Sequence, residues 1–567
     1  MRTFNKTPLA LGVAAGMAML VASTGAQAGS TGTDLNLSAH TIAGGMAGAA
    51  YTRPQEASAA VFGNPATLTQ FPGVNVNFGA TLISLESLEV ETDTSWLASE
   101  AVLGAGATIE GHDVHQSAAD NYIVPTLGIT LQVSPNLTLG LGLEADAGLG
   151  ADYRNDPLEL FGGALYNAQQ AFGAGDSDVG AAALGLNIPL NGPVAAPLVV
   201  EVISFNANLA AGYKVTPALS LGGSLTIGFG LAQLGTAGPT TGFDTVSDLV
   251  IDGLVGGTHD GVLESGAAAG GMLGLTGPQE GILSNWGGST SSVHDISFGW
   301  TLGSTYLVAD GITTSLTVKS GVEYKFKDII YGDPVGTGGG FVPGSSADGW
   351  QHLDVEQPLE VIAGVAFEDV LAEGLLVELD VIWKNWGDAD AYQDAYEDQF
   401  LVALGAQYST GAWSYRAGYS YAEDILKDTP NSTLGQLYGL GNLPLGDGAA
   451  VLDTVAAVPI VEALATDFID IVQMSLLPVL YTHTVTAGIG YDFTDAVSAN
   501  AFVSYSLPEE ESRDLATANA AGAVGLSTLG LLRDGCNPLA EACGSSSISQ
   551  DLGAEYMVGV GINIALP

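Results

Sequence analysis

The sequence is poor in basic residues and lacks long uninterrupted apolar runs, and each shortage excludes a class of protein. Lysine and arginine total 13 against 61 acidic residues, which gives a formal net charge of −48 at pH 7. Nucleic-acid binding is excluded, because phosphate backbones bind basic surfaces. Beyond residue 28 no stretch offers the roughly 18 uncharged apolar residues that a transmembrane helix needs. The best candidate, 451–480, is interrupted by acidic residues such as Asp467.

The composition is nevertheless apolar. Mean hydropathy is +0.31, only 13% of the residues are charged, and 78 are glycines. A membrane β-barrel combines these properties, because its paired strands satisfy every backbone group without a continuous apolar run. The composition therefore favours an all-β membrane protein.

The first residues have the pattern of an export signal. Arg2 and Lys6 precede an apolar run over 9–22, and Ala26-Gln27-Ala28 follows as a small-x-small cleavage site. We expect a signal peptide over 1–28, removed after Ala28. The alternative, a membrane anchor, is disfavoured because the run is short for a span.

Strict alternation over about ten residues recurs along the chain. The third such segment is the clearest: Leu137 to Leu149 places large apolar residues and alanines on one face, and glycine, Glu144 and Asp146 on the other. This period of two predicts a strand with one face toward lipid and one toward the lumen. The predicted strands are 74–84, 122–133, 137–149, 199–213, 218–230, 294–308, 312–327, 359–367, 375–386, 399–408, 413–422, 482–491, 497–506 and 552–566. The prediction is a transmembrane antiparallel barrel of about 14 strands.

The connections alternate between short and long. Short ones contain Pro, Asp or Gly and suit periplasmic turns, whereas the long ones suit the extracellular side. Acidic runs such as Glu509-Glu510-Glu511 fall in the long connections, either as solvated loop tips or as a surface suited to salt water. Helical spacing in 452–480 and 245–255 predicts loop helices, which either cover their own apolar face or offer a landing surface to an apolar ligand.

The segment before the first strand, 39–69, is rich in small residues and contains the turn signal Asn64-Pro65. Small residues allow short helical pieces to pack in a confined space. We expect residues 29–73 to form a plug and 74–567 to form the barrel around it.

The string GGMAGAAYTRPQEASAAVFGNPATLTQF within residues 40–71 resembles the N-terminal hatch of the FadL/TodX family of outer-membrane transporters. Further similar stretches lie at 133–153, 213–227, 379–386 and 413–426. The chain departs from the family in ending on Leu566-Pro567 rather than on an aromatic residue.

This resemblance implies a monomer in the bacterial outer membrane, among lipid and lipopolysaccharide, that passively takes up hydrophobic molecules. Long-chain fatty acids are the family default, with an alkane or aromatic hydrocarbon as the other possibility. Loop capture, lumen binding and lateral exit through a gap in the wall would be the steps. The alternative is a structural or adhesive barrel without transport. An enzyme is not expected, because spacing places no Ser/His/acid set.

Two groups of residues, one on the plug and one on the third strand, are site candidates. Asn64, Pro65 and Ala66 would hold the plug. Asp146, Ala147 and Gly148 would form the lateral gate, because Gly148 and Gly150 weaken the strand and the family is kinked in its third strand. The alternative is that these glycines, predicted to face inward, only make room for the plug.

The lumen face carries predicted charges, of which Lys319 and Arg416 are candidates for binding a ligand carboxylate. The other inward charges by parity are Glu323, Lys325, Glu378, Asp380 and Lys384. The alternative role is mutual salt bridges and hydrogen bonds to the plug. Glu144 and Asp146 would repel an anion, which keeps a neutral substrate in contention.

Cys536 and Cys543 lie close together in an exported chain, which predicts a loop disulfide, with two free thiols as the alternative. His112 and His115 could contact a metal, but without a third ligand a solvated pair is favoured. No metal or cofactor is expected, because the glycine repeats lie on strands and not in a strand–turn–helix.

Overall fold

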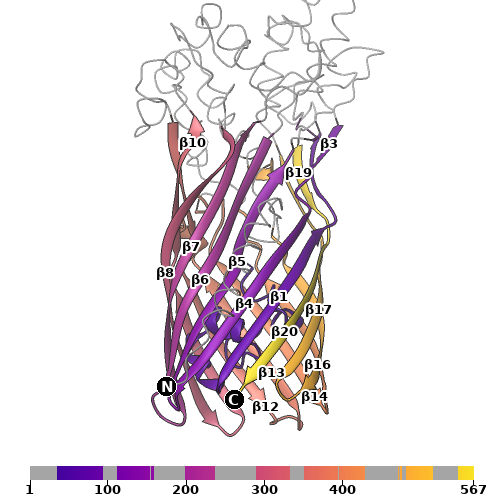
Figure 1. Ribbon diagram of the computed structural model, residues 1–567. Coiled ribbons are helices and arrows are strands. Elements are labelled where there is room, and N and C mark those ends of the chain that lie inside the picture. The colour runs from indigo at the N-terminus through magenta and orange to yellow at the C-terminus, as the bar shows by residue number, and fades with distance from the viewer. Residues whose placement is uncertain are drawn as a thin grey trace, which may run out of the picture.

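The computed structural model describes residues 35–93, 112–153, 155–156, 158, 198–236, 289–331, 350–393, 395–427, 470, 473–475, 480–514 and 547–567. Within these residues, fourteen antiparallel strands close into a barrel (Figure 1). The predicted fold class and strand number are confirmed. No helix in these ranges is long and apolar enough to cross a membrane.

The barrel strands are β1 (Val74–Leu85), β4 (Asn121–Ser134), β5 (Leu137–Asp152), β6 (Leu198–Lys214), β7 (Leu219–Thr236), β8 (Ser289–Ala309), β9 (Ile312–Lys319), β12 (Glu360–Glu368), β13 (Leu375–Lys384), β14 (Gln399–Thr410), β15 (Trp413–Ala422), β16 (His483–Thr494), β17 (Val497–Ser506) and β20 (Glu555–Leu566). Each strand pairs with its neighbours in this series, and β20 closes the wall by pairing with both β17 and β1. The last strand therefore forms fully despite the non-aromatic C-terminus, with Leu566 opposite Val74.

Alternation along each strand separates a lipid face from a lumen face. On β8, Phe298, Trp300 and Leu302 are exposed on the outside, whereas Thr301 between them is buried. The hairpin to β9 is made by Asp310 and Gly311, and Gly311 adopts a φ of 72° that favours glycine. The alternating pattern and the tight turn together set the register of this hairpin.

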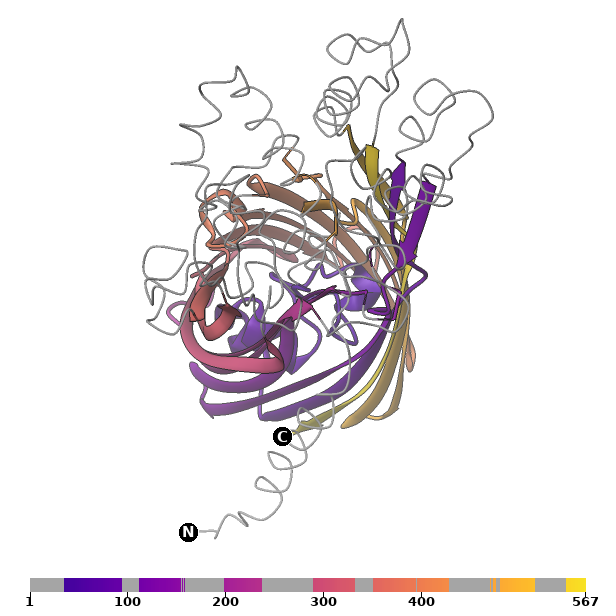
Figure 2. The ribbon, with the colours of Figure 1, turned by 90° about the horizontal axis from the view of Figure 1, so that it is seen from above.

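The plug, defined here as residues 35–73, lies inside the barrel near the end with the short turns (Figures 1 and 2). In outer-membrane barrels that end faces the periplasm. Its helices are short: the 3-10 helices η1 (Gly44–Met46) and η2 (Pro65–Gln70), and the α-helix α2 (Ala57–Phe62). α2 is buried along its whole length, because alanine and serine allow it to approach the wall closely.

Two small sheets stand at the opposite end, which is the extracellular one. One consists of β18 (Glu509–Asp514), β19 (Ser547–Leu552), β2 (Leu88–Asp93) and β3 (His112–Gln116) in that order. The other pairs β10 (Val322–Tyr331) with β11 (Trp350–Gln357). A further 3-10 helix, η4 (Trp386–Asp388), follows β13.

The prediction that one strand runs through 312–327 and points Glu323 and Lys325 inward was wrong. The barrel strand β9 ends at Lys319, and β10 leaves the wall to pair with β11. Across this break the parity changes, so that Val322, Tyr324 and Phe326 are buried while Glu323 and Lys325 are exposed. The aromatic rings of Tyr324 and Phe326 stack with centroids 5.9 Å apart.

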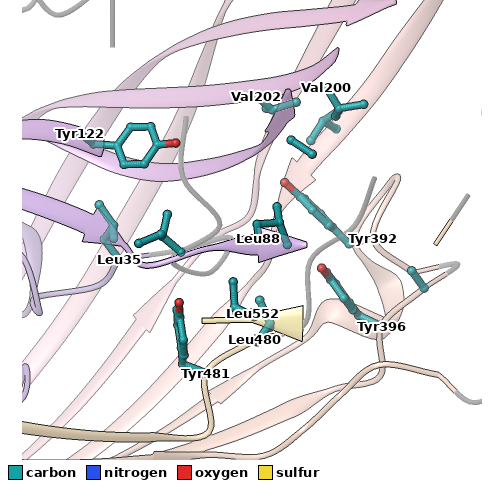
Figure 3. Close-up of a cluster of buried hydrophobic side chains, with 14 of the residues drawn as sticks. Leu35, Leu88, Tyr122, Val200, Val202, Tyr392, Tyr396, Leu480, Tyr481 and Leu552 are labelled. Carbon is teal, nitrogen blue, oxygen red and sulfur yellow. The ribbon is translucent and has the colours of Figure 1, made fainter. Parts of the chain in front are cut away.

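A buried apolar cluster joins Leu35 and Ala39 of the plug to side chains of both extracellular sheets, and Figure 3 shows part of it. It brings together side chains from strands and connections that are far apart in the sequence, including Leu88, Val202, Tyr392 and Leu552. Trp386 packs edge-on to Tyr392, with centroids 4.9 Å apart. The extracellular part of the described lumen is therefore lined by apolar side chains.

Candidate functional site: the plug and the adjoining wall

Asn64 fixes the turn between α2 and η2. Its Oδ1 accepts a hydrogen bond from the Ala66 backbone N–H at 3.0 Å, which caps η2, and Pro65 occupies the first helical position. Its Nδ2 donates to the carbonyl oxygens of Tyr51 at 3.0 Å and of Ser304, on β8, at 3.2 Å. One buried side chain thus links two parts of the plug to the wall.

Glycines of the wall allow the plug backbone to approach it. A Cβ atom at Gly222 on β7 would collide with the backbone of Pro65 and Ala66, and one at Gly418 on β15 with the backbone of Met46 and Ala47. Larger residues at these positions would therefore displace the plug.

Two buried acids of β13 bind the main chain of the plug. Glu378 accepts the backbone N–H of Thr52 at 2.6 Å and of Arg53 at 3.1 Å, and Asp380 accepts that of Tyr51 at 3.3 Å. Both acids are 0% exposed. Since buried carboxylates need such donors, this pair anchors the plug. Hydrogen bonds to the plug were one of the two roles that the sequence left open for the lumen charges.

A buried Ser–His–acid set joins the plug to β5. His40 Nε2 lies 2.7 Å from Glu144 Oε2, and His40 Nδ1 lies 2.8 Å from the Ser58 hydroxyl. Ser58 in turn contacts Asn77 of β1, whose Nδ2 donates to the Ser58 hydroxyl at 2.9 Å. The sequence did not reveal this set, because its members are 18 and 104 residues apart and no local motif marks them.

The protonation of His40 is decided by burial. Burial lowers the pKa of His40 to about 4, with the charge of Glu56 raising it in part. The short contact with Glu144 alone would favour an imidazolium, but for a fully enclosed ring desolvation is the stronger effect. A neutral ring then donates a hydrogen bond from Nε2 to Glu144 and accepts one from the Ser58 hydroxyl at Nδ1. Because Ser58 and His40 are 0% and 1% exposed, this set holds the plug and presents no accessible nucleophile.

The hydrogen-bond ladder between β4 and β5 stops partway along both strands. The pairing extends from Ser134 opposite Leu137 to Thr126 opposite Glu144. Beyond it, among the residues that the structure describes, residues 121–125 of β4 form a ladder with β1 alone and residues 145–152 of β5 with β6 alone. The Asp152 carbonyl oxygen in addition accepts a hydrogen bond from the Ala118 backbone N–H at 2.8 Å. Pro125, which has no N–H to donate, is the first residue of β4 past the paired part. We call these two stretches the unpaired segment of β4 and β5, a name that refers only to the missing ladder between the two strands and not to the other contacts of their residues.

Asp146 lies at the start of this segment as an extra residue. The register between β5 and β6 shifts between Ala145 and Ala147, which is a β-bulge. The Asp146 carbonyl oxygen accepts a hydrogen bond from the backbone N–H of Leu35, the first described residue of the plug, at 2.9 Å. Sequence-predicted gate residues, the ladder end and the plug therefore meet at one place.

The bulge corrects the predicted faces of β5. One extra residue reverses the side on which every later residue lies. Ala147 pairs with Ser204 and Gly148 with Ile203, which places Ala147 on the lumen side and Gly148 and Gly150 on the lipid side. By this register, the expectation that Gly148 and Gly150 face inward was wrong.

The two predicted ligand-binding cations have partners in the wall. Lys319 Nζ lies 3.2 Å from Glu360 Oε2 and 5.6 Å from the centroid of the Tyr51 ring. Arg416 donates from Nε to Gln407 at 2.6 Å and from Nη1 to Asn500 at 2.9 Å. A ligand carboxylate would compete with these contacts.

The remaining predicted sites are elsewhere. Cys536 and Cys543 fall outside the described residues, so their disulfide stays a prediction; the predicted loop helices over 245–255 and most of 452–480 fall outside them as well. His112 and His115 both lie on β3, but His112 contacts Glu91 at 3.2 Å and His115 contacts Asp156 at 3.3 Å, so that each has an acidic partner of its own. Among the residues that the structure places, no group of three or more His, Cys, Asp or Glu side chains could hold a metal ion.

Comparison with known proteins agrees with this architecture. Residues 195–434 match the family model of the outer membrane protein transport proteins (OMPP1/FadL/TodX). A comparison with curated proteins gives no match.

Solved structures with a similar course include three outer-membrane proteins. A FadL homologue of Pseudomonas aeruginosa has 12% identity and a TM-score of 0.51, over 93% of this chain and 98% of that chain. The toluene transporter TodX of P. putida has 17% identity and a TM-score of 0.48, over 90% and 94%. The toluene transporter TbuX of Ralstonia pickettii has 14% identity and a TM-score of 0.47, over 94% and 100%. The FadL homologue shows the same fold. The family match over residues 195–434 confirms the resemblance of this chain to the FadL/TodX family of outer-membrane transport proteins.

Proposed function

We propose that this protein takes up hydrophobic small molecules passively across the outer membrane and releases them sideways through the wall. The unpaired segment of β4 and β5 carries the proposal. Lipid offers no hydrogen bonds to a backbone, so an interruption of the ladder between two neighbouring wall strands of a membrane barrel needs a function that accounts for it. A lateral exit beside the plug is such a function.

The position of the segment supports this route. It begins at the Asp146 bulge, where Leu35 of the plug bonds β5, and it contributes Tyr122, Val124 and Ala151 to the apolar cluster. A ligand that enters from the extracellular side reaches apolar side chains first and the polar anchors of the plug afterwards. Leaving sideways into the bilayer would keep an apolar molecule away from water.

The described lumen favours an uncharged ligand over a fatty-acid anion. Lys319 and Arg416 already have wall partners, and the buried acids Glu144, Glu378 and Asp380 would repel a carboxylate. Long-chain fatty acids, which the resemblance implies, therefore remain a candidate that must displace existing contacts. A neutral hydrocarbon or its derivative meets no such obstacle.

The exit is tested by deleting Asp146. Without the extra residue β5 regains a continuous alternation, so its extracellular half can continue the ladder with β4. We expect uptake of a labelled hydrocarbon into a host without other transporters of this kind to fall to background. Heat-modifiability on a gel serves as the measure of barrel assembly and should not change. Uptake at the parental rate in an assembled variant would place the exit elsewhere, such as through the plug to the periplasm.

The chain division is part of the proposal. Residues 1–28 would be removed on export, 29–73 would form the plug and 74–567 the barrel. N-terminal sequencing of the outer-membrane protein should begin at Gly29, and a retained Met1 would contradict it.

A further inference from the structure

A polar row crosses the lumen wall above the plug and ends at a buried acid. Ser420, Thr484, Ser506 and Glu555 stand opposite one another on the adjacent strands β15, β16, β17 and β20. The Thr484 and Ser506 hydroxyls are 2.9 Å apart, and the Ser506 hydroxyl donates to Glu555 Oε1 at 3.2 Å. Three hydroxyls in succession thus lead to one carboxyl group.

Glu555 has an unused oxygen. The side chain is 2% exposed, and its Oε2 atom has no hydrogen-bond partner among the residues that the structure describes. A buried carboxyl oxygen without a partner is costly. No basic side chain in the described part of the chain forms an ion pair with Glu555, unlike Glu360, which contacts Lys319 and Lys384.

A cavity of about 100 Å³ adjoins this row. Its lining includes all four residues of the row together with Leu35 and Tyr481. Figure 3 shows Leu35 and Tyr481 at one side of the apolar cluster. An apolar cavity of about 150 Å³ can hold benzene, so this smaller one suits a head group, with the rest of the molecule directed to the apolar side chains.

We infer that this cavity is a binding site for the hydroxyl group of a hydrophobic alcohol or phenol. A hydroxyl both donates and accepts hydrogen bonds, so it can pair with Glu555 in either protonation state and with the hydroxyl row at the same time. A carboxylate ligand is repelled by Glu555 and a plain hydrocarbon leaves Oε2 without a partner. The inference deepens the proposed function, and rests on it, by naming a ligand class within the lumen.

The site also adjoins the proposed exit. Leu35 and Ser38 line the cavity, and the backbone N–H of Leu35 bonds the Asp146 carbonyl oxygen at the bulge. One short piece of the plug therefore touches both the cavity and the start of the unpaired segment. A ligand bound to Glu555 would lie next to Leu35, which bonds Asp146 at the start of the proposed exit.

Binding of three matched probes tests the inference. Toluene, 4-methylphenol and 4-methylanisole have similar size, and only the phenol carries a hydrogen-bond donor. Affinities are measured by competition with a fluorescent apolar probe on the full-length protein in lipid nanodiscs. We expect the wild type to bind 4-methylphenol at least about tenfold more tightly than the other two, as one hydrogen bond to a charged or buried acceptor implies.

The variant Glu555→Leu should bind toluene as the wild type does and should lose the preference for the phenol to within about twofold. Thr484→Val, which removes one hydroxyl of the row and keeps its shape, should reduce the preference about threefold and serves if Glu555→Leu fails to assemble. Glu373→Gln removes an exposed acid from a short turn and should change nothing.

Equal binding of all three probes by the wild type, or a preference that persists in both Glu555→Leu and Thr484→Val, would overturn the inference and leave the proposed function intact. A wild type that binds none of the three and does not transport hydrocarbon would overturn both.

Discussion

The two halves of β5 have opposite surroundings, although they belong to one strand. In the periplasmic half, residues 137–144 pair with β4 on one side and β6 on the other, and a Cβ at Gly142 would collide with the Phe62 ring of the plug. In the extracellular half, residues 145–152 pair with β6 alone. The first half is hydrogen-bonded on both sides, as in a continuous barrel wall, and the second half is hydrogen-bonded on one side, as in the edge strand of a sheet. On the proposed route, the periplasmic half of β5 holds the plug and the extracellular half opens the wall, within the 16 residues of one strand.

The largest expected effect on hydrocarbon uptake comes from a bulky side chain in the unpaired segment. Ala147→Trp places a bulky ring on the lumen side of the unpaired segment, where Ala147 is 4% exposed. Hydrocarbon uptake should fall at least about tenfold, because overpacking a confined position displaces its neighbours. Leu139→Trp is the control in the periplasmic half, since Leu139 already faces lipid with 42% exposure. Equal uptake by both variants, with both assembled, would remove the functional difference between the halves.

The next effect concerns the anchors of the plug on β13. Glu378→Gln replaces one of the two acceptor oxygens with an amide NH2 group, which cannot accept a hydrogen bond from the backbone N–H that it faces. The remaining oxygen still accepts a hydrogen bond but no longer carries a negative charge. We expect docking of the plug to weaken by about 3 kcal/mol, since each hydrogen bond to a charged group contributes about 1.5–3 kcal/mol. Hydrogen exchange of amides 51–53 reports the loss, and Glu373→Gln is again the control. Unchanged protection at these amides would mean that the contact contributes little to docking.

Lowering the pH should weaken the same docking through His40. The docked ring has a pKa of about 4 against the ordinary 6.5, so a released plug binds a proton that the docked plug does not. Stability is therefore complete above pH 6.5 and is lost as the pH falls toward 4, by about 2 kcal/mol at pH 5. Protease cleavage of the plug, measured from pH 7 to pH 5, should rise in the wild type and much less in His40→Gln. Parallel pH profiles of the two proteins would exclude His40 as the cause.

The smallest effect is expected at the turn. Asn64→Ala removes the cap of η2 and the bonds to the carbonyls of Tyr51 and Ser304, for a loss of about 1–2 kcal/mol. Asn64→Ser keeps a side-chain oxygen for the cap and loses the two donated bonds without adding a buried charge, which separates the contributions. Both should increase cleavage of the plug, with the Ala variant cleaved faster. Unchanged cleavage and unchanged uptake in Asn64→Ala would show that the turn does not hold the plug.

The sequence predicted the wall well because alternation of period two has no other common cause. The strand expected over 74–84 is Val74–Leu85, and the one expected over 497–506 is Val497–Ser506. The strands β2 and β18 were missed, because LEVETD and EEESRD are short and acidic and their charges indicate loops.

The site was less predictable for a physical reason. Alanine and glycine do not indicate which face of a strand they occupy, so the parity change at Asp146 leaves no trace in EADAGLG. Contacts such as His40 with Glu144 join residues 104 positions apart, and only the closed barrel brings them together. Asn64 was identifiable, because Asn before Pro marks a cap and a turn within a few residues.

The contact of Glu378 and Asp380 with the plug has a consequence for exchanging parts between proteins. These acids bind backbone N–H groups at Tyr51, Thr52 and Arg53, so this pair of acids recognises amides, whereas the side chains of the same plug residues are bound by other wall residues such as Ser315 and Glu368. A grafted plug of foreign sequence should keep the bonds to Glu378 and Asp380 if its backbone follows the same course. Proline is the residue type that these positions reject outright, because it has no N–H to donate, and Pro54 stands just beyond them.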